Sequence, residues 1–464
     1  MKTKILYTSI AAALLTLAGC QIAPVHDKPG APVPGSFPSA GANAKAAAEI
    51  GWREFFQNAE LQEVIAQALA NNRDLKTAAL RIEEARAIYN VQRADQLPTV
   101  NATAGVTNSQ QLLRGQAFKS TVYQVGLGLT AFELDYLGRV KNLSNAALAQ
   151  FFATEEARRT AQIALVGEVA KAWLSERALA EQAVIADRTL KAREASYGLV
   201  KQRFDAGVTN ALELRQSETL VQSARVAALA YKRQHAQSVN ALGLLVGSSA
   251  RLPEQKATLS AQAITADIGA GLPSDLLVNR PDIRAAEQRL RSNQANIAAA
   301  RAAFFPRISL TAVVGLASPQ LSDLFDNPTR TWSFAPQLTL PIFDAGRNSA
   351  NLDLAKVRTN IAVADYEKSI QVAFREVADA LDARATLAEE VSAQESVRNA
   401  QAARMELAQA RYKNGVANYL EVLDAERELY SAEQQLLQTR LLKLTNAVDL
   451  YRSLGGGLKE TGAQ

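Results

Sequence analysis

The chain has 464 residues, of which 48% are hydrophobic and 21% are charged, and its formal net charge is +5. This composition is ordinary for a folded protein, and basic residues are interleaved with acidic ones, so nothing indicates a nucleic-acid partner. The two histidines, His26 and His235, lie far from each other, and the single cysteine is Cys20, which argues against a metal site or Cys/His chemistry. We expect no metal and no cofactor.

Residues 1–19 predict a signal peptide, because two lysines precede an apolar stretch and small residues lead up to Cys20. The stretch resembles a bacterial lipoprotein signal, which implies cleavage before Cys20 and covalent lipid, such as palmitate, on that residue. Gln21 follows rather than Asp, which in such lipoproteins implies sorting to the outer membrane. Each buried CH₂ adds about 0.8 kcal/mol to anchoring, so the acyl chains would hold the protein stably at the membrane. Residues 20–58 are expected to form an extended, lipid-anchored segment. A buried structural cysteine is the alternative.

A long internal repeat runs through the rest of the chain, with corresponding residues 208 positions apart. The matched pairs include Pro98 and Pro306, Gly138 and Gly346, Gly207 and Gly415, and Glu213 and Glu421. One constant offset indicates two tandem halves, 59–250 and 276–456, joined by a linker at 251–275 and followed by a tail at 457–464. Each half is expected to contain a helix, a β-hairpin, a very long helix and a shorter helix.

Long stretches without Gly or Pro predict the helices. Residues 52–97 predict one helix that stops at Pro98. Residues 348–414 predict a helix of 67 residues, which at 1.5 Å per residue spans about 100 Å, and 139–206 is its counterpart in the first half. The last helix carries a heptad seam formed by Leu423, Tyr430, Leu437, Leu444 and Tyr451. A soluble coiled-coil rod is the alternative for these helices alone.

Four segments alternate between apolar and polar residues, which is typical of outer-membrane strands. They are 99–107, 121–132, 307–316 and 331–342. Tyr123, Trp332 and Phe334 lie near the loop ends, where an aromatic girdle is expected, and loops 108–120 and 317–330 would face the cell exterior. An ordinary soluble sheet with one buried face gives the same alternation, so the strands alone leave both interpretations open.

The four predicted strands are too few to close a membrane barrel, whose smallest size is about 8 strands. After Cys20 the sequence has no run of about 18 apolar residues, so no transmembrane helix is predicted. Two chains would supply about 8 strands and three about 12. A barrel of 8 strands fills with side chains whereas a larger one leaves a channel, so a conduit favours three chains.

Special backbone is expected where strands meet helices. Pro98 and Pro306 lie at the helix-to-strand passages, and Gly138, Pro341 and Gly346 lie at the strand-to-helix passages. Proline cannot donate a hydrogen bond to a neighbouring strand, and glycine permits sharp turns. We expect these residues to break the regular elements at each passage.

Two similar turns, "RFDAGVTNALEL" at 203–214 and "RYKNGVANYLEVLD" at 411–424, follow the long helices. Gly207 and Gly415 are expected to reverse the chain. Asn210 with Glu213, and Asn418 with Glu421, have the spacing of an N-cap and the third helical residue, as in a capping box.

Asp424 lies beyond the first turn of its helix, and its counterpart in the first half is Gln216, so capping does not explain it. Glu421 and Asp424 are one helical turn apart, and an enzyme that used them as acid and base, as glycosidases use two carboxylates, is an alternative. The sequence offers no nearby histidine, no nucleophile motif and no glycine-rich phosphate loop, so we do not expect an enzyme.

The signal with Cys20, the duplicated halves, "FELDYLGR" at 132–139, "PIFDAGR" at 341–347 and the two turns together resemble the TolC/OprM-type outer-membrane efflux channels over 50–456. The resemblance implies a mainly α fold with membrane β-structure. Three chains would share one 12-stranded β-barrel above a 12-helix α-barrel that extends about 100 Å into the periplasm. A mixed region near 250–275, with both termini, would surround the tunnel.

The resemblance also implies a gate at the periplasmic end, formed here by Glu213, Tyr412, Glu421 and Asp424. In a trimer each acid becomes a ring of three, and like charges repel by about 1 kcal/mol per pair at 4 Å in water. An acidic mouth favours cations. The family carries an arginine where this chain has Ala417, so that gate contact is expected to be missing.

Taken together, the sequence predicts a lipid-anchored homotrimer in the outer membrane that serves as the passive exit channel of a tripartite, RND-type drug efflux pump. No nucleotide-binding motif is present, so energy would come from an inner-membrane transporter through a periplasmic adaptor. Two alternatives stay open: a channel for type I protein secretion, and a periplasmic lipoprotein scaffold without a pore.

Overall fold

The computed structural model describes most of the chain, namely residues 22–37, 47–113, 116–247, 259, 264, 268, 273–326 and 329–461. The predicted signal peptide, Cys20 and most of the 251–275 linker lie outside the described residues. The chain divides into two compact units. Unit 1 comprises Met1–Gly30, Arg81–Glu155 and Ala285–Glu367, and unit 2 comprises Ala31–Leu80, Glu156–Arg284 and Lys368–Gln464.

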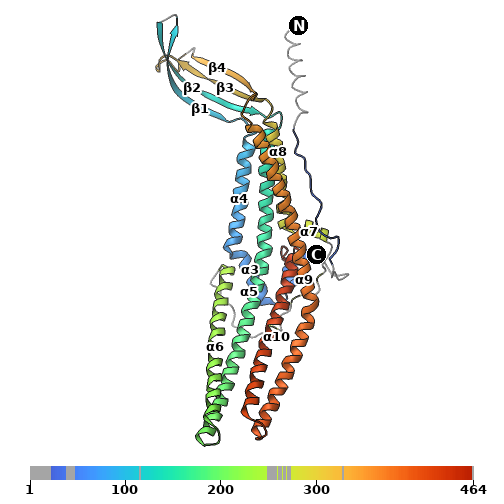
Figure 1. Cartoon of the computed structure of the whole chain (residues 1–464). Helices are drawn as coiled ribbons and strands as arrows, with labels where there is room; N and C mark the ends of the chain where they lie inside the picture. The colour runs from blue at the N-terminus through green and yellow to red at the C-terminus, as the bar shows by residue number, and fades with distance from the viewer. Residues whose placement is uncertain are drawn as a thin grey trace. The chain divides into compact units, whose positions relative to one another are not determined.

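The two halves of the chain contain the same elements in the same order (Figure 1). After the short helices η2 (Ala47–Glu49) and α2 (Trp52–Phe55), the first half contains α3 (Ala59–Asn71), α4 (Arg73–Ala94), β1 (Val100–Leu113), β2 (Gln116–Leu134), α5 (Arg139–Asp205) and α6 (Ala211–Val246). The second half contains α7 (Pro273–Asn279), α8 (Pro281–Ala302), β3 (Arg307–Ser318), β4 (Arg330–Thr339), α9 (Arg347–Lys413) and α10 (Tyr419–Ser453). The predicted tandem organisation is confirmed, and α5 and α9 have 67 residues each.

The single helix predicted over 52–97 is wrong, because two asparagines divide it into α2, α3 and α4. The Asn58 side chain accepts a hydrogen bond from a backbone N–H in the first turn of α3 at 3.0 Å. The Asn72 side chain accepts a hydrogen bond from the Leu75 N–H, in the first turn of α4, at 2.9 Å. The same side chain donates a hydrogen bond to the Leu245 carbonyl at 2.8 Å. An asparagine that satisfies a helix start in this way can end the preceding helix without Gly or Pro.

A belt of aromatic and backbone contacts in unit 2 joins residues 52–55 to residues 451–460. The Trp52 N–H donates to the Lys459 carbonyl at 3.0 Å. The fully buried Phe55 ring stacks on the Tyr451 ring with 4.0 Å between centroids. The expectation that residues 20–58 are extended is therefore wrong for part of this segment, because it contains a helical turn that buries apolar rings.

The four strands form one antiparallel sheet in the order β1-β2-β3-β4. The first hairpin is longer than its predicted strands, 99–107 and 121–132, because pairing runs from Val100↔Leu129 to Leu113↔Gln116. Most of the predicted loop 108–120 is thus strand. In the second hairpin, β3 ends two residues later than predicted, and β4 spans Arg330–Thr339 rather than 331–342.

A bulge interrupts the predicted alternation of β2. The register of β2 against β3 shifts between Leu129 and Phe132, and Ala131 has a φ of 48°. A bulge adds a residue to one strand, so side chains beyond it change faces. The side chain of Ala131 therefore does not continue the alternation predicted for residues 121–132.

The central strands approach closely where two glycines face each other. Gly126 pairs with Gly315 across β2 and β3. A Cβ at Gly126 would lie 2.6 Å from the Val314 carbonyl oxygen, and a Cβ at Gly315 would lie closer still to the Val125 carbonyl oxygen. Glycine is required at both positions because no side-chain atom fits between the strands.

The motif "FELDYLGR" builds the passage from β2 to α5. The Arg139 guanidinium donates two hydrogen bonds to the Glu133 carboxylate, at 2.8 and 2.7 Å. The Asp135 carboxylate accepts from a backbone N–H in the first turn of α5 at 2.7 Å, and the Tyr136 hydroxyl donates to the Pro306 carbonyl at 2.6 Å. These contacts fix the angle at which the strand enters the helix.

The passage from β4 to α9 uses a carboxylate in the same way. Asp344 accepts hydrogen bonds from the N–H groups of Gly346 and Asn348, at 2.9 Å each. Gly138 and Gly346, the two glycines expected at these passages, have φ of 79° and 82°. Pro306 lies directly before β3, Pro98 lies two residues before β1, and Pro341 lies two residues beyond β4.

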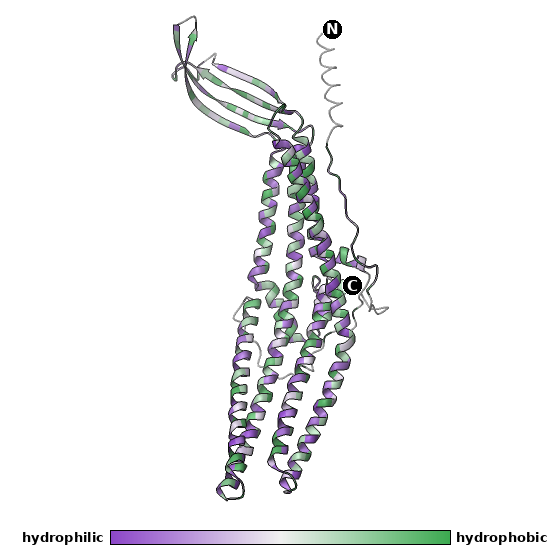
Figure 2. Cartoon of the chain, viewed as in Figure 1, coloured by the Kyte–Doolittle hydropathy of each residue, from purple (hydrophilic) through white to green (hydrophobic). Residues whose placement is uncertain are grey.

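Hydrophilic residues recur along every long helix (Figure 2). Within the part of the chain that the structure describes, no helix combines the length and the apolar character that a membrane-spanning helix needs.

Replacing Gly315 with Val should weaken the sheet, because the new side chain forces β2 and β3 apart. Overpacking of this kind costs about 1–3 kcal/mol. Gly105→Val is the matched control, since a Cβ at Gly105 meets no atom within 4 Å. Thermal unfolding of the purified protein should show a lower midpoint for Gly315→Val only. Equal midpoints for the two variants would contradict the close approach.

Candidate functional site

The two turns that follow α5 and α9 have the same backbone. In the first, the Val208 N–H donates to the Arg203 carbonyl at 2.8 Å and the Gly207 N–H donates to the Phe204 carbonyl at 2.9 Å. The second turn repeats both bonds, at 2.9 and 3.0 Å. Gly207 and Gly415 have φ of 74° and 71°, which is the left-handed backbone that this helix termination requires.

An asparagine starts the helix after each turn. The side chain of Asn210 accepts a hydrogen bond from the Glu213 N–H at 3.0 Å, and that of Asn418 accepts one from the Glu421 N–H at 3.3 Å. The predicted N-caps are therefore present. Both glutamate carboxylates bind to groups other than the cap backbone, so they take part in contacts that a capping box does not describe.

One hydroxyl connects the two helical hairpins, α5–α6 and α9–α10. Tyr412 of α9 accepts a hydrogen bond from the Arg203 guanidinium of α5 and donates one to the Glu213 carboxylate of α6 at 3.4 Å. The Thr209 hydroxyl donates to the other oxygen of the Glu213 carboxylate. Burial, opposed by the nearby Arg203 charge and assisted by that of Glu213, raises the pKa of Tyr412, so its hydroxyl keeps the proton that it donates.

Two other predicted gate residues, Glu421 and Asp424, bind arginines of their own hairpin. Asp424 lies between Arg404 of α9, at 2.9 Å, and Arg427 of α10, at 2.6 Å. Glu421 lies 3.3 Å from Arg411. The structure thus brings Glu213 and Tyr412 together and keeps Glu421 and Asp424 in separate ion pairs. Each of these acids carries its own counter-charge in the single chain.

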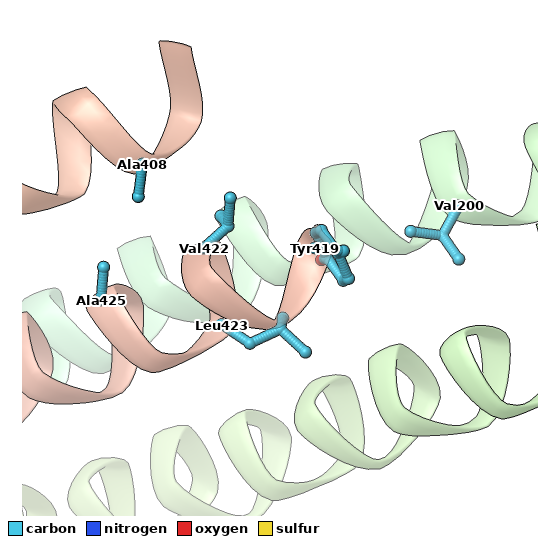
Figure 3. Packing of buried hydrophobic residues seen from close by; sticks show 6 residues of the cluster. All are labelled: Val200, Ala408, Tyr419, Val422, Leu423 and Ala425. Atoms are coloured by element: carbon cyan, nitrogen blue, oxygen red, sulfur yellow. The ribbon is translucent and has the colours of Figure 1, made fainter. Parts of the chain in front are cut away.

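A buried group of apolar residues, the tip cluster, packs beside these contacts (Figure 3). It consists of Val200, Ala408, Tyr419, Val422, Leu423 and Ala425. The Tyr419 ring is 6% exposed, and its centroid lies 5.2 Å from that of Tyr412. The cluster draws on α5, α9 and α10, so the turns are held to one another by packing as well as by polar contacts.

Sequence reasoning missed the arginines of this site, although signals for them exist. Arg203 and Arg411 are repeat counterparts within the turn motif. In an antiparallel hairpin, residues equally distant from the turn lie opposite each other, as Arg404 and Asp424 do. The first half has no matching charges, because Arg404, Asp424 and Arg427 correspond to Ser196, Gln216 and Thr219.

This arrangement can hold helices together and can present charge at the end of a hairpin. Among the described residues, no three His, Cys, Asp or Glu side chains are grouped so as to bind a metal ion. Glu421 and Asp424 are each bound to arginine and lie about half exposed, which does not resemble an acid and base poised over a substrate.

Comparisons with known proteins point to one family. The family model described as "Outer membrane efflux protein" matches residues 64–248 and 272–456, one match in each half. The outer membrane protein OprJ of Pseudomonas aeruginosa is 46% identical over 96% of this chain and 95% of its own length. The solvent efflux pump outer membrane protein SrpC of Pseudomonas putida is 44% identical over 96% of this chain and 97% of its own.

Solved structures agree in fold. The open state of the MtrE outer membrane channel of Neisseria gonorrhoeae superposes with a TM-score of 0.88 at 39% identity, covering 96% of this chain and all of that one. CusC, whose crystal structures concern transmembrane channel formation, gives a TM-score of 0.85 at 40% identity, covering 94% of this chain and all of that one. The family resemblance expected from the sequence motifs is confirmed.

Asp424→Ala should change the free energy of unfolding by less than about 1 kcal/mol, because half-exposed ion pairs contribute little. Leu423→Ala, one residue away in the tip cluster, should cost about 2–5 kcal/mol. Urea unfolding of both variants measures the difference. If Asp424→Ala lowered the free energy of unfolding as much as Leu423→Ala does, the assignment of Asp424 to surface ion pairs would be wrong.

Proposed function

The chain belongs to the outer membrane efflux protein family, and we propose that three copies form the outer-membrane exit channel of a tripartite pump for drugs and other small molecules. The observation that carries this proposal is the family match in both halves, together with relatives that share almost the full length and are named as outer-membrane parts of efflux pumps. We further propose that lipid on Cys20 anchors each chain to the outer membrane.

The sheet supports assembly from several chains. It has four strands, and β1 and β4 are its edges, so a single chain leaves two rows of backbone groups without strand partners. Large apolar side chains of β4 are exposed in the single chain, with Trp332 at 77%, Phe334 at 59% and Leu338 at 65%. Three copies would join edge to edge into a barrel of about 12 strands, with such side chains against lipid.

The tip contacts support a gate at the periplasmic end. Glu213, Tyr412, Glu421 and Asp424 lie at or beside the two turns, where three chains would bring their hairpins together. In this proposal the Tyr412 contacts must break for the hairpins to separate. Ala417 offers no arginine to the gate, and the chain's own arginines, such as Arg203, supply the positive charges there.

The exit channel would be passive, with no catalytic step. Energy would come from an inner-membrane transporter, linked to the channel by a periplasmic adaptor. The names of relatives refer to solvents, toluene and antibiotics, which favours small molecules over the proteins of type I secretion as the exported class. A scaffold without a pore is the remaining alternative, and conductance separates it from a channel.

Purified protein should conduct ions in planar bilayers with a preference for cations. Glu421→Ala combined with Asp424→Ala should raise the mean conductance and lower that preference, because the acids and their arginine contacts are removed from the mouth. Glu406→Ala, at an exposed site of α9, is the control and should behave as the unchanged protein. Absence of any conductance excludes the channel, whereas a normal channel in the double variant removes these acids from the gate.

Deleting the gene should make the host several-fold more sensitive to solvents or antibiotics, as measured by minimal inhibitory concentration, while its secreted proteins stay unchanged. Expression from a plasmid should restore tolerance. Loss of one secreted protein with unchanged tolerance would instead identify a type I secretion channel.

A further inference from the structure

Glu426 places an acidic side chain in the seam where α10 packs against α5. Tyr419 and Glu426 are seven residues apart on α10, and so are Arg193 and Val200 on α5, so each pair occupies one face of its helix. Val200 and Tyr419 already meet in the tip cluster. Glu426 correspondingly comes within electrostatic reach of Arg193, two turns farther from the tip.

Three polar atoms in this part of the seam have no hydrogen-bond partner among the described residues. One carboxylate oxygen of Glu426, the Nε of Arg193 and the hydroxyl of Tyr430 are buried and have no hydrogen-bond partner among the described residues. Arg193 is 9% exposed and uses its Nη1 to donate to the Leu220 carbonyl of α6 at 3.2 Å. Although Glu426 and Arg193 have opposite charges, they are not among the ion pairs of the described structure.

A carboxylate with one buried, unpartnered oxygen is costly to keep charged, which favours its protonated form. Burial raises the pKa of Glu426, and the Arg193 charge only partly opposes that effect. The other titratable groups that face this site are Tyr419 and Tyr430 of α10 and, next to Tyr430, Tyr231 of α6. Burial raises the pKa of Tyr419 and Tyr430, so both stay uncharged.

We propose that Glu426 is a proton-controlled latch between the α5–α6 and α9–α10 hairpins. The protonated carboxyl fits the closed seam, whereas the carboxylate favours a parted seam in which water reaches it. The proposal concerns the seam of one chain, and its link to gating rests on the proposed function.

The direction of the pH effect follows from the difference between the two states. The pKa of Glu426 is raised in the closed seam and returns toward its ordinary value of 4.5 when water enters. The closed seam therefore binds the proton more tightly and is most favoured below that ordinary value. Its advantage is lost as the pH rises through the raised pKa, and each unit of difference changes the closed-to-parted ratio by up to about tenfold.

Spin labels on the two hairpins measure this seam directly. Leu199 of α5 and Leu420 of α10 are exposed, near the tip and distinct from the latch, so cysteines there can carry the labels. Every sample is the full chain in nanodiscs, and Cys20 is kept because the lipid proposed on it blocks its thiol, so that only the two introduced cysteines react with the label. Double electron–electron resonance should show a narrow, short distance at low pH and a broader, longer one as the pH rises.

Substitutions decide whether Glu426 causes that shift. Glu426→Gln, which stays neutral, should keep the short distance at every pH. Arg193→Gln removes the charge that opposes protonation, so the midpoint should move to higher pH. Glu428→Gln is the control, because Glu428 lies on the same helix, is more exposed and pairs with Arg427, and its profile should match the parent protein.

Three outcomes contradict the latch proposal: a label distance that does not change with pH in the parent protein, a Glu426→Gln profile with the midpoint of the parent protein, or an unchanged midpoint in Arg193→Gln. The last variant keeps the test decisive even if Glu426→Gln fails to fold. Bilayer recordings separate the two proposals. If the protein conducts but shows no pH response that depends on Glu426, the channel proposal stands and the latch proposal fails. If the distances follow pH in a protein that does not conduct, the latch proposal stands and the channel proposal fails.

Discussion

The reversal of the backbone at Gly207 and Gly415 is the constraint on which the rest of the site depends. A positive φ at each glycine ends a helix of 67 residues and sends the chain back along it. Because the reversal fixes which residues lie opposite each other, it also fixes the pairing of Arg404 with Asp424 and of Arg411 with Glu421. The capping asparagines then start the returning helices, so a few local residues define the register of each hairpin over its full length.

The two halves share this backbone and differ in the side chains placed on it. Tyr412 corresponds to Phe204 of the first half, which has no hydroxyl, so the first turn has no counterpart of the Tyr412 contacts. Asp424 likewise corresponds to the uncharged Gln216. Both halves therefore have the same backbone turn, whereas the Asp424 ion pairs with Arg404 and Arg427 occur at positions where the first half has uncharged residues.

Features set by local chemistry were predictable from the sequence, and features set by distant partners were not. The long helices, the glycine turns and the asparagine caps follow from residues close in sequence. The break at Asn72 was missed because that side chain is also held by Leu245, which lies 173 residues away. The strand extension across 108–120 was missed because its polar residues pair through their backbone, and the bulge at Ala131 breaks a period that the sequence continues. In the site, the acids were recognisable, whereas the arginines that bind them depend on hairpin register.

The belt contacts have a consequence for the order of folding. Trp52 is hydrogen-bonded to Lys459, and the neighbouring pair Arg53 and Glu460 is separated by 407 positions. Closing so long a loop costs conformational entropy, and the contacts between its ends offset that cost only after they have formed. The belt can close only once residues 459 and 460 are present, whereas the helical hairpins form from contacts closer in sequence. The hairpins can therefore form before the belt, and the contacts of Trp52 and Arg53 with Lys459 and Glu460 close unit 2 last.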